Sequence, residues 1–466
     1  MIEDEGDYYD TSFNEGLEKF EKSLDGESLG FFDSDQIEFI IDHYLINGMY
    51  SKAVIAADLG INQFSFNHLF LLRKAQAISA LGQLKEALDL LTQIEKEGNL
   101  SCEFFLTKAS IFSQLKDSKR AIKYFKEALN LSDQEDKNEI YLDLALEYQS
   151  SNDFYSAIAI LQEAIKFNPH NEGAIYELAF CYEQINEIKK AIKCYSDFIN
   201  ENPYSFTAWY NLGNAYSKLE NFKKAIWAYD YCLLINEEFG PAYFNLGNAY
   251  LSSEKYHRAI ENFEKFMEID GEDGLALCYI GECHEHLKHY ELAKHYYHRS
   301  IEFTPTLSEA WLGLGIVRDL EGNTIEAIHL IKRAIDLDPC NSSFYHVLAE
   351  AYEKANNIEE AQAAYLMSLE LDNSNEEALY DYINFLIELN LHKEAILFLN
   401  EYEINENLNI EKELLLINLK YLLNKIDEAV ILLSSCIQTN KKKSLKLFSF
   451  YPKLKHEAKF VNLFSK

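Results

Sequence analysis

The order of apolar and polar positions along the chain repeats at a fixed interval. Residues 208–229, AWYNLGNAYSKLENFKKAIWAY, align without a gap with residues 242–263, AYFNLGNAYLSSEKYHRAIENF, at a shift of 34 positions. In each segment large apolar residues recur three or four positions apart, which places them on one face of an α-helix. This periodicity predicts a tandem array of helical units instead of several separate compact domains.

An alanine, here called the marker alanine, occupies the same position in every unit. Extending the shift of 34 in both directions recovers it each time, with one interval of 36 after Ala121. Twelve units in one register predict a repeat array over residues 34–443. We expect the two additional residues to lengthen the loop around Ser132 to Asn138. The marker alanines are Ala53, Ala87, Ala121, Ala157, Ala191, Ala225, Ala259, Ala293, Ala327, Ala361, Ala395 and Ala429.

A small residue stands twelve positions before the marker alanine in nine of the twelve units. Both positions fall within helical pattern, so each unit is predicted to be two antiparallel helices that approach closely where these small residues lie. Large residues fill the gaps beside them, such as Leu212 and Tyr216 on either side of Gly213. The small residues are Ala75, Ala109, Ala145, Ala179, Gly213, Gly247, Gly281, Gly315 and Ala349.

The unit resembles the tetratricopeptide repeat in its period and in the residues at set positions. One unit carries Trp209, Leu212, Gly213, Tyr216, Ala225 and Tyr229, and a later one carries Trp311, Gly315, Ala327, Ala334 and Pro339. The resemblance implies an all-α fold, a right-handed superhelical solenoid of antiparallel helix pairs whose first helices line a concave face. It also implies that the groove on this face binds partner proteins or extended peptide segments.

The two ends of the chain depart from the repeat. Residues 1–33 are expected to form an acidic N-terminal tail or cap, and residues 444–466 to form capping helices over the last unit. Ile41, Ile383 and Ile417 occupy the small-residue position in the first unit and the last two, as expected of outer repeats. The C-terminal segment alternates apolar and basic residues at helical spacing, so a helix lying on a membrane surface is the alternative interpretation.

The net charge of −33 bounds the class of partner. A nucleic-acid-binding protein needs clustered Lys and Arg, and this chain would repel a polyanion, so DNA and RNA are not expected as partners. Basic or neutral protein segments fit better. The N-terminus lacks the pattern of a signal peptide, and no long apolar run predicts membrane insertion. Together with eight scattered cysteines, these features favour a cytoplasmic protein.

The first candidate site is a pair of asparagines that occurs twice. Asn211 with Asn214, and Asn245 with Asn248, sit three positions apart on the first helix of their units and share a face. A side-chain amide both donates and accepts, so it can bind a peptide backbone with little regard to sequence. The arrangement resembles the asparagine ladder of O-linked N-acetylglucosamine transferases. Alternatively, NLGNAY is simply a favoured helix sequence in this repeat. Tyr210 and Phe244 precede the two pairs and are further candidate contacts.

The second candidate site is an acidic inner face. The resemblance implies that a set of carboxylates points toward the groove, where it would attract Lys- or Arg-rich segments. The alternative is a generally acidic surface with no focus. The residues are Glu183, Glu282, Glu285, Glu309, Asp319, Glu350 and Glu353.

Candidate chemistry beyond binding is sparse. Five histidines fall within residues 284–298, yet no HxxxH or CxxC spacing accompanies them, so no metal site is assigned there. No catalytic motif stands out, and neither enzyme activity nor a cofactor is expected. The sequence therefore predicts a non-enzymatic scaffold or adaptor that binds partner proteins. The alternative is a regulator that senses a peptide or other ligand and changes its superhelical conformation.

Overall fold

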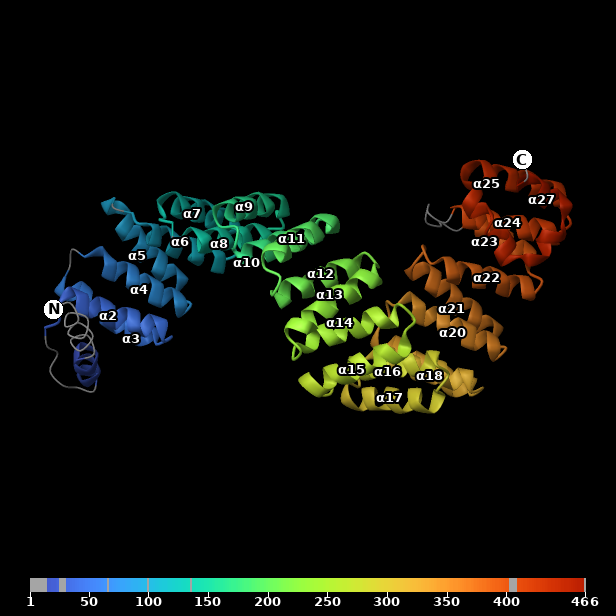
Figure 1. Cartoon of the computed structure of the whole chain (residues 1–466), viewed down its shortest axis with the longest axis horizontal. Helices are drawn as coiled ribbons and strands as arrows, with labels where there is room; N and C mark the ends of the chain where they lie inside the picture. The colour runs from blue at the N-terminus through green and yellow to red at the C-terminus, as the bar shows by residue number, and fades with distance from the viewer. Residues whose placement is uncertain are drawn as a thin grey trace. The chain divides into compact units, whose positions relative to one another are not determined.

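The computed structural model describes residues 15–24, 31–64, 67–98, 100–134, 136–401 and 409–464. These residues form helices and no β-strand, so the predicted all-α fold class is confirmed (Figure 1). The chain divides into two compact units, Met1–Ile235 and Asn236–Lys466, called unit 1 and unit 2 below. No helix in the described part of the chain combines the length and apolar character that crossing a membrane requires.

The helices follow one another as antiparallel pairs, in which even labels mark the first helix and odd labels the second. Unit 1 contains α2 (Ser34–Ile46), α3 (Tyr50–Gln63), α4 (His68–Ala80), α5 (Leu84–Glu97), α6 (Cys102–Gln114), α7 (Ser118–Leu131), α8 (Lys137–Ser150), α9 (Phe154–Phe167), α10 (Glu172–Gln184), α11 (Ile188–Glu201), α12 (Phe206–Lys218) and α13 (Phe222–Ile235).

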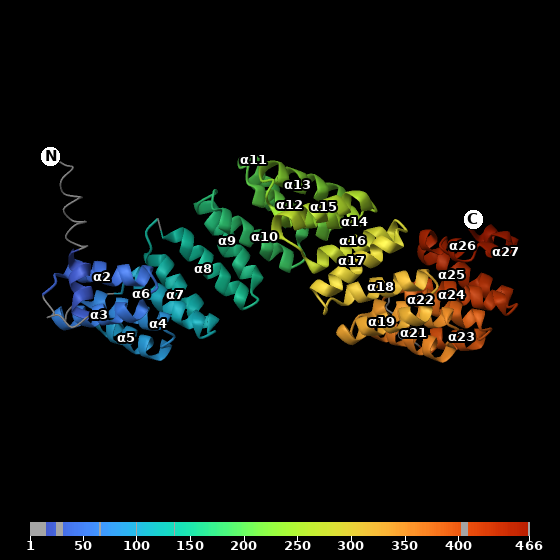
Figure 2. The ribbon, with the colours of Figure 1, turned by 90° about the horizontal axis from the view of Figure 1, so that it is seen from below.

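Unit 2 continues the same alternation and ends in three short helices. It contains α14 (Gly240–Leu251), α15 (Tyr256–Asp270), α16 (Gly274–His286), α17 (Tyr290–Phe303), α18 (Ser308–Leu320), α19 (Thr324–Leu337), α20 (Ser342–Lys354), α21 (Ile358–Leu371), α22 (Glu376–Glu388), α23 (His392–Glu401), α24 (Asn409–Leu422), α25 (Ile426–Ser444), α26 (Leu447–Phe450), the 3₁₀ helix η2 (Pro452–His456) and α27 (Ala458–Phe464). Figure 2 shows α22, α24, α25 and α26 gathered at this end of unit 2.

Most pairs join a first helix of 13 residues to a second helix of 14, as α10 and α11 do. The interval of 36 arises because α8 has 14 residues and because residues 132–136 separate α7 from α8. Other pairs have a four-residue connection, such as 168–171 between α9 and α10. One additional residue therefore lies in the loop, as predicted, and the other lies in α8.

Close packing within each pair explains the two small positions. All twelve marker alanines lie on second helices and are fully buried. The preceding small residue makes room for the side chain four positions after the marker alanine, which is an aromatic ring in six of the twelve pairs. A Cβ added to Gly247 would lie 2.7 Å from Cε1 of Phe263, and one added to Gly281 would lie 2.8 Å from Cδ1 of Tyr297. The predicted close approach is thus confirmed at these glycines, where the partner is an aromatic ring, and at Gly315, where the partner is Ile331.

The turn between the two helices of each pair carries a residue with a left-handed backbone, five positions before the marker alanine. At Glu220 (φ 55°) the turn is closed by two bonds, from Glu220 N–H to Ser217 O (2.8 Å) and from Asn221 N–H to Tyr216 O (2.9 Å). This is the arrangement that ends many helices and that favours glycine. The residues are Gly48, Gly82, Lys116, Asn152, Asn186, Glu220, Glu254, Lys288, Gly322, Asn356, Asn390 and Asn424.

Additional segments pack against the first and last pairs. Residues 15–24 form a helix whose Phe20 is buried against Phe32 and Tyr44, with ring centroids 6.2 and 5.9 Å apart. The rest of the expected N-terminal tail, residues 1–14 and 25–30, lies outside the described residues. At the other end, α26, η2 and α27 bury Leu447 and Phe460 in a cluster with residues of α24 and α25.

The left-handed turn residues generate a stability prediction. Glu220→Gly should stabilise the protein by about 1 kcal/mol, because glycine adopts positive φ without the steric cost that a side chain imposes. The shift in the midpoint of urea unfolding measures the change.

Glu127→Gly is the matched control, because Glu127 is an exposed residue in the interior of α7. There glycine should destabilise by roughly 1 kcal/mol. A loss of stability in both variants would contradict the role assigned to the turn position.

Candidate functional site

Two pockets open on the faces formed by first helices, one within each unit. The unit 1 pocket has a volume of about 670 Å³ and lies over α4, α6 and α8. The unit 2 pocket has a volume of about 680 Å³ and lies over α20, α22 and the adjoining Phe450 and Tyr451. Both volumes fall in the range of binding sites for small ligands or side chains.

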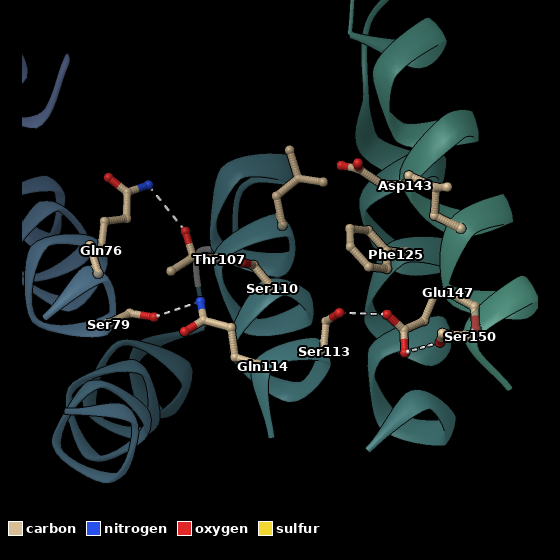
Figure 3. Close-up of a pocket in the computed structure, with 13 residues that line it drawn as sticks. Gln76, Ser79, Thr107, Ser110, Ser113, Gln114, Phe125, Asp143, Glu147 and Ser150 are labelled. Atoms are coloured by element: carbon tan, nitrogen blue, oxygen red, sulfur yellow. Dashed lines mark hydrogen bonds between the residues drawn. The ribbon is translucent and has the colours of Figure 1, made fainter. Parts of the chain in front are cut away.

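The unit 1 pocket is lined mainly by hydroxyl and amide side chains (Figure 3). Leu106, Phe125 and Leu146 add apolar surface, and Asp143 and Glu147 add two carboxylates. Such a lining offers many hydrogen-bond donors and acceptors, which suits a polypeptide backbone. The hydroxyl and amide residues are Gln76, Ser79, Thr107, Ser110, Ser113, Gln114 and Ser150.

Hydrogen bonds between neighbouring first helices hold this lining in place. Gln76 Nε2 donates to Thr107 Oγ1 (3.1 Å), which links α4 to α6. Ser113 Oγ donates to Glu147 Oε2 (2.6 Å), which links α6 to α8. Glu147 is only 5% exposed, so this bond and a second one from Ser150 (3.3 Å) offset the cost of burying its charge. The pocket is therefore largely preorganised.

The unit 2 pocket combines carboxylates with aromatic rings. The carboxylates come from Glu350, Glu353, Asp381 and Glu388. Tyr365 and Phe385 contact each other at 5.6 Å, and Tyr380 contacts Phe450 at 4.8 Å and Tyr451 at 6.0 Å between ring centroids. This pairing of negative charge with π-faces suits a cation.

The one lysine in the lining of this pocket, Lys354, already forms an ion pair. Lys354 Nζ binds Asp319 Oδ2 at 2.6 Å, and Asp319 also accepts from Thr324 Oγ1 (2.8 Å). Glu353 accepts a hydrogen bond from Tyr365 (2.8 Å). Burial raises the pKa of Glu353 and of Glu350 above the ordinary value of a glutamate. The raised pKa makes these two glutamates harder to ionise, but the lining still holds four carboxylates against one lysine, which is paired with Asp319.

His346 lies beneath this pocket and is 8% exposed. Its Nε2 is 2.9 Å from Asp381 Oδ2. Burial opposes protonation, but the hydrogen bond to Asp381 and the charge of Glu350 raise the pKa of His346 above its usual value. Ligand atoms of His346, Glu350 and Asp381 lie within 4.8 Å of one another, the one such group of three in the described residues.

The histidine-rich residues 284–298 make packing contacts. The His284 ring stacks on Tyr296 at 5.4 Å, and the His286 ring stacks on Tyr256 at 4.8 Å. Burial lowers the pKa of His284. The His284 ring therefore packs between α16 and α17, and the His286 ring packs between α15 and α16.

The two predicted asparagine pairs lie on the first helices of successive repeats, one at the end of unit 1 and one at the start of unit 2. In unit 1, Asn214 accepts a hydrogen bond from the Tyr229 hydroxyl (2.8 Å), and the Tyr210 ring lies 6.1 Å from that of Tyr229. In unit 2, Phe244 packs against Phe266 with ring centroids 5.1 Å apart. Asn211, Asn245 and Asn248 are partly exposed. Their role in binding remains a prediction.

Several carboxylates of the predicted acidic face have partners inside the repeat array. Glu183 and Asp319 bind Lys218 (2.5 Å) and Lys354, each 35 positions further along the chain. Glu285 accepts from the Tyr297 hydroxyl (2.8 Å), 12 positions further along. Ser308 donates to Glu309 (3.1 Å), and Glu282 lies 3.9 Å from His286. Of the seven carboxylates, Glu350 and Glu353 line the unit 2 pocket.

The repeat register connects both pockets to the predicted asparagines. Asn211 and Asn214 stand 14 and 11 positions before their marker alanine. The position 11 before is taken by Gln76, Ser110 and Leu146 in the unit 1 pocket and by Glu350 and Asn384 in the unit 2 pocket. The position 14 before is taken by Thr107, Asp143 and Asp381. Counting along the register would have found these residues.

Phe450 and Tyr451 line the unit 2 pocket but do not belong to the repeat register. They come from the segment after the last repeat, about 70 positions from Tyr380, and the Tyr380 hydroxyl donates to Phe450 O at 3.3 Å. The fold of the C-terminal helices places them in the pocket. The repeat interval could not have predicted this position.

Parts of the chain match the models of described families. Residues 206–239 and 240–273 match a tetratricopeptide repeat family model, and residues 330–363 match another model of that repeat. Residues 114–198 match the family described as anaphase-promoting complex, cyclosome, subunit 3. No curated protein matches the chain.

Solved structures similar to this chain include three repeat proteins. A tetratricopeptide repeat protein from Parabacteroides merdae is 17% identical over 54% of this chain and 98% of its own, with a TM-score of 0.47. YrrB, a tetratricopeptide repeat protein with an unusual peptide-binding site, is 24% identical over 40% and 96%, with a TM-score of 0.31. The APC/C hetero-tetramer Cut9–Hcn1 is 15% identical over 98% and 93%, with a TM-score of 0.42.

The half-buried Glu285 of α16 gives a prediction for the pH dependence of stability. Burial raises the pKa of Glu285 from 4.5 to about 7, against the hydrogen bond from Tyr297, which lowers it. Ionising Glu285 is thus easier in the unfolded chain, and its contribution to stability falls as the pH rises from about 4.5 to 7. Glu285→Gln should therefore stabilise the protein at pH 8 by roughly 1 kcal/mol and change little at pH 4.5.

Urea unfolding of the two proteins at both pH values measures this difference. Glu302→Gln, at an exposed position of α17, is the control for the change in net charge. The prediction is rejected if the stability difference between Glu285→Gln and the wild type is the same at both pH values.

Proposed function

The chain is a tetratricopeptide repeat protein, and from this premise we propose that it is a non-enzymatic scaffold that binds other proteins through the faces of its first helices. Tetratricopeptide repeats typically serve as non-enzymatic scaffolds, which supports this class of function. YrrB is described as having an unusual peptide-binding site. Cut9–Hcn1 is described as a hetero-tetramer of the APC/C. Extended peptide segments are the proposed ligands.

The observation that carries the proposal is that two pockets occupy the same register positions on first helices but differ in chemistry. Ser110 in unit 1 and Asn384 in unit 2 both stand 11 positions before their marker alanine. Hydroxyls and amides surround Ser110, whereas carboxylates and aromatic rings surround Asn384. The unit 1 pocket suits the backbone of an uncharged segment, and the unit 2 pocket suits a basic one.

Matched arginine substitutions test this proposal. Ser110→Arg and Asn384→Arg place the same bulky cation at the same register position of the two pockets. In affinity purification of the full chain from its native cell, each variant should lose partners that the wild type retains, because the side chain blocks one pocket. Mass spectrometry of the captured proteins gives the readout.

Asn130→Arg, at an exposed position of the second helix α7, controls for the added charge and bulk. It should retain the wild-type partners. Identical partner lists for the wild type and both pocket variants would reject binding through the first-helix faces.

The asparagine pairs extend the proposal beyond the two pockets. Replacing Asn211, Asn214, Asn245 and Asn248 with alanine should weaken partner binding and leave helicity unchanged, because alanine removes the amides but favours helix. Circular dichroism checks the helicity, and pull-down of the same partners checks binding. Full retention of every partner by this variant would remove these residues from the binding surface.

A further inference from the structure

The unit 2 pocket has the shape and charge to hold a single cationic side chain. Its volume of about 680 Å³ exceeds that of a lysine or arginine side chain, so part of the adjoining backbone can enter as well. Four carboxylates line it against one lysine, and that lysine already binds Asp319. Asp381 also binds His346 and Glu353 accepts from Tyr365, so a partner's cation would chiefly meet Glu350 and Glu388.

Two of these carboxylates have no direct hydrogen-bond partner among the described residues, although a ligand atom of Glu350 lies within 4.8 Å of one of His346. Glu350 and Glu388 have neither a hydrogen bond nor an ion pair with any residue that the structure describes. Glu350 stands one helical turn after His346 on α20, and Glu388 lies at the end of α22. Both side chains are exposed, so a partner's cation can reach them, and desolvation raises the pKa of Glu350, which a nearby cation would lower again.

Aromatic rings complete the lining. Tyr380, Phe450 and Tyr451 form a contiguous group, with centroid distances of 4.8 Å and 6.0 Å from Tyr380 to the other two rings. A guanidinium or ammonium group over such rings gains a cation–π interaction, which increases when water is excluded. The alkyl part of a long basic side chain can pack on the same rings.

The chain itself already binds a lysine beside this pocket in the same way. Lys446 Nζ lies 2.7 Å from Glu376 Oε1 and 3.5 Å from Glu411 Oε1, and 5.9 Å from the centroid of the Phe450 ring. Glu376 begins α22, the helix that supplies Tyr380 and Asp381 to the pocket. One lysine between carboxylates and Phe450 is thus an internal example of the recognition that the pocket can offer.

We infer that the unit 2 pocket binds a lysine or arginine side chain of a partner's extended segment, between the carboxylates of Glu350 and Glu388 and the rings of Tyr380 and Phe450. The inference rests on the proposed scaffold function and specifies its ligand. The peptide backbone would lie along the faces of α20 and α22, where Asn384 can bond to it.

Fluorescence anisotropy of the full chain with labelled oligo-arginine and oligo-lysine peptides tests the inference, with oligo-citrulline as the uncharged probe. The double variant Glu350→Gln, Glu388→Gln should weaken binding of the cationic peptides by about ten-fold, because it removes the unpaired charges. A larger loss for oligo-arginine than for oligo-lysine would identify the guanidinium as the preferred group.

The double variant Glu359→Gln, Glu360→Gln is the matched control. It makes the same change in net charge at exposed positions of the second helix α21 in the same repeat, so it should weaken binding by only about two-fold or less. Tyr380→Leu keeps every carboxylate and should still weaken the cationic peptides if the rings contribute. Thermal unfolding of each variant checks that the fold is retained.

Equal losses in the two glutamine variants would overturn the inference, because binding would then follow net charge alone. Displacement of the cationic peptides by micromolar Zn²⁺ in the wild type, but not in His346→Gln, would also overturn it by assigning the pocket to a metal. If the pocket variants bind peptides normally while Asn384→Arg still loses native partners, the scaffold function stands and the cationic pocket fails.

Discussion

The close contact between the two helices of each pair is the constraint on which the rest of the structure depends. In nine of the twelve pairs, a fully buried alanine on the second helix and a small residue on the first leave room for a large side chain, as Gly281 does for the Tyr297 ring and Gly315 for Ile331. This contact fixes which side of the first helix faces its partner. The residues 14, 11 and 7 positions before the marker alanine remain available to line a pocket, and they line both pockets.

Contacts between successive first helices use a second recurring interval. Lys218 with Glu183, Lys354 with Asp319 and His346 with Asp381 are each 35 positions apart in the sequence and form ion pairs or hydrogen bonds. These contacts neutralise some of the carboxylates on the first-helix face. The chain is strongly acidic overall, and on the first-helix face of the unit 2 pocket Glu350 and Glu388 lack such a contact within the described part of the chain.

The sequence predicted the helix pairs well because their signal is local and periodic. The marker alanines recur in every repeat, and Gly213, Gly247 and Gly281 belong to the nine repeats that also keep a small residue on the first helix. The left-handed turn residue is equally periodic and could have been found, although Lys116, Glu220, Glu254 and Lys288 obscure its preference for glycine and asparagine. Ion pairs were harder to foresee, because they depend on which residue occupies the neighbouring repeat.

The residues of the unit 2 pocket likewise fall into two groups, those that the repeat register identifies and those that it does not. Asp381 and Asn384 occupy the register positions of Asn211 and Asn214, so the repeat interval was sufficient to identify them. Phe450, Tyr451 and Lys446 lie after the last repeat, and only the folded C-terminal helices bring them to α22. A repeat array can therefore keep one packing rule throughout and still build distinct sites. The exposed register positions vary without disturbing the pair contact, and a segment outside the repeat can close a pocket at one end.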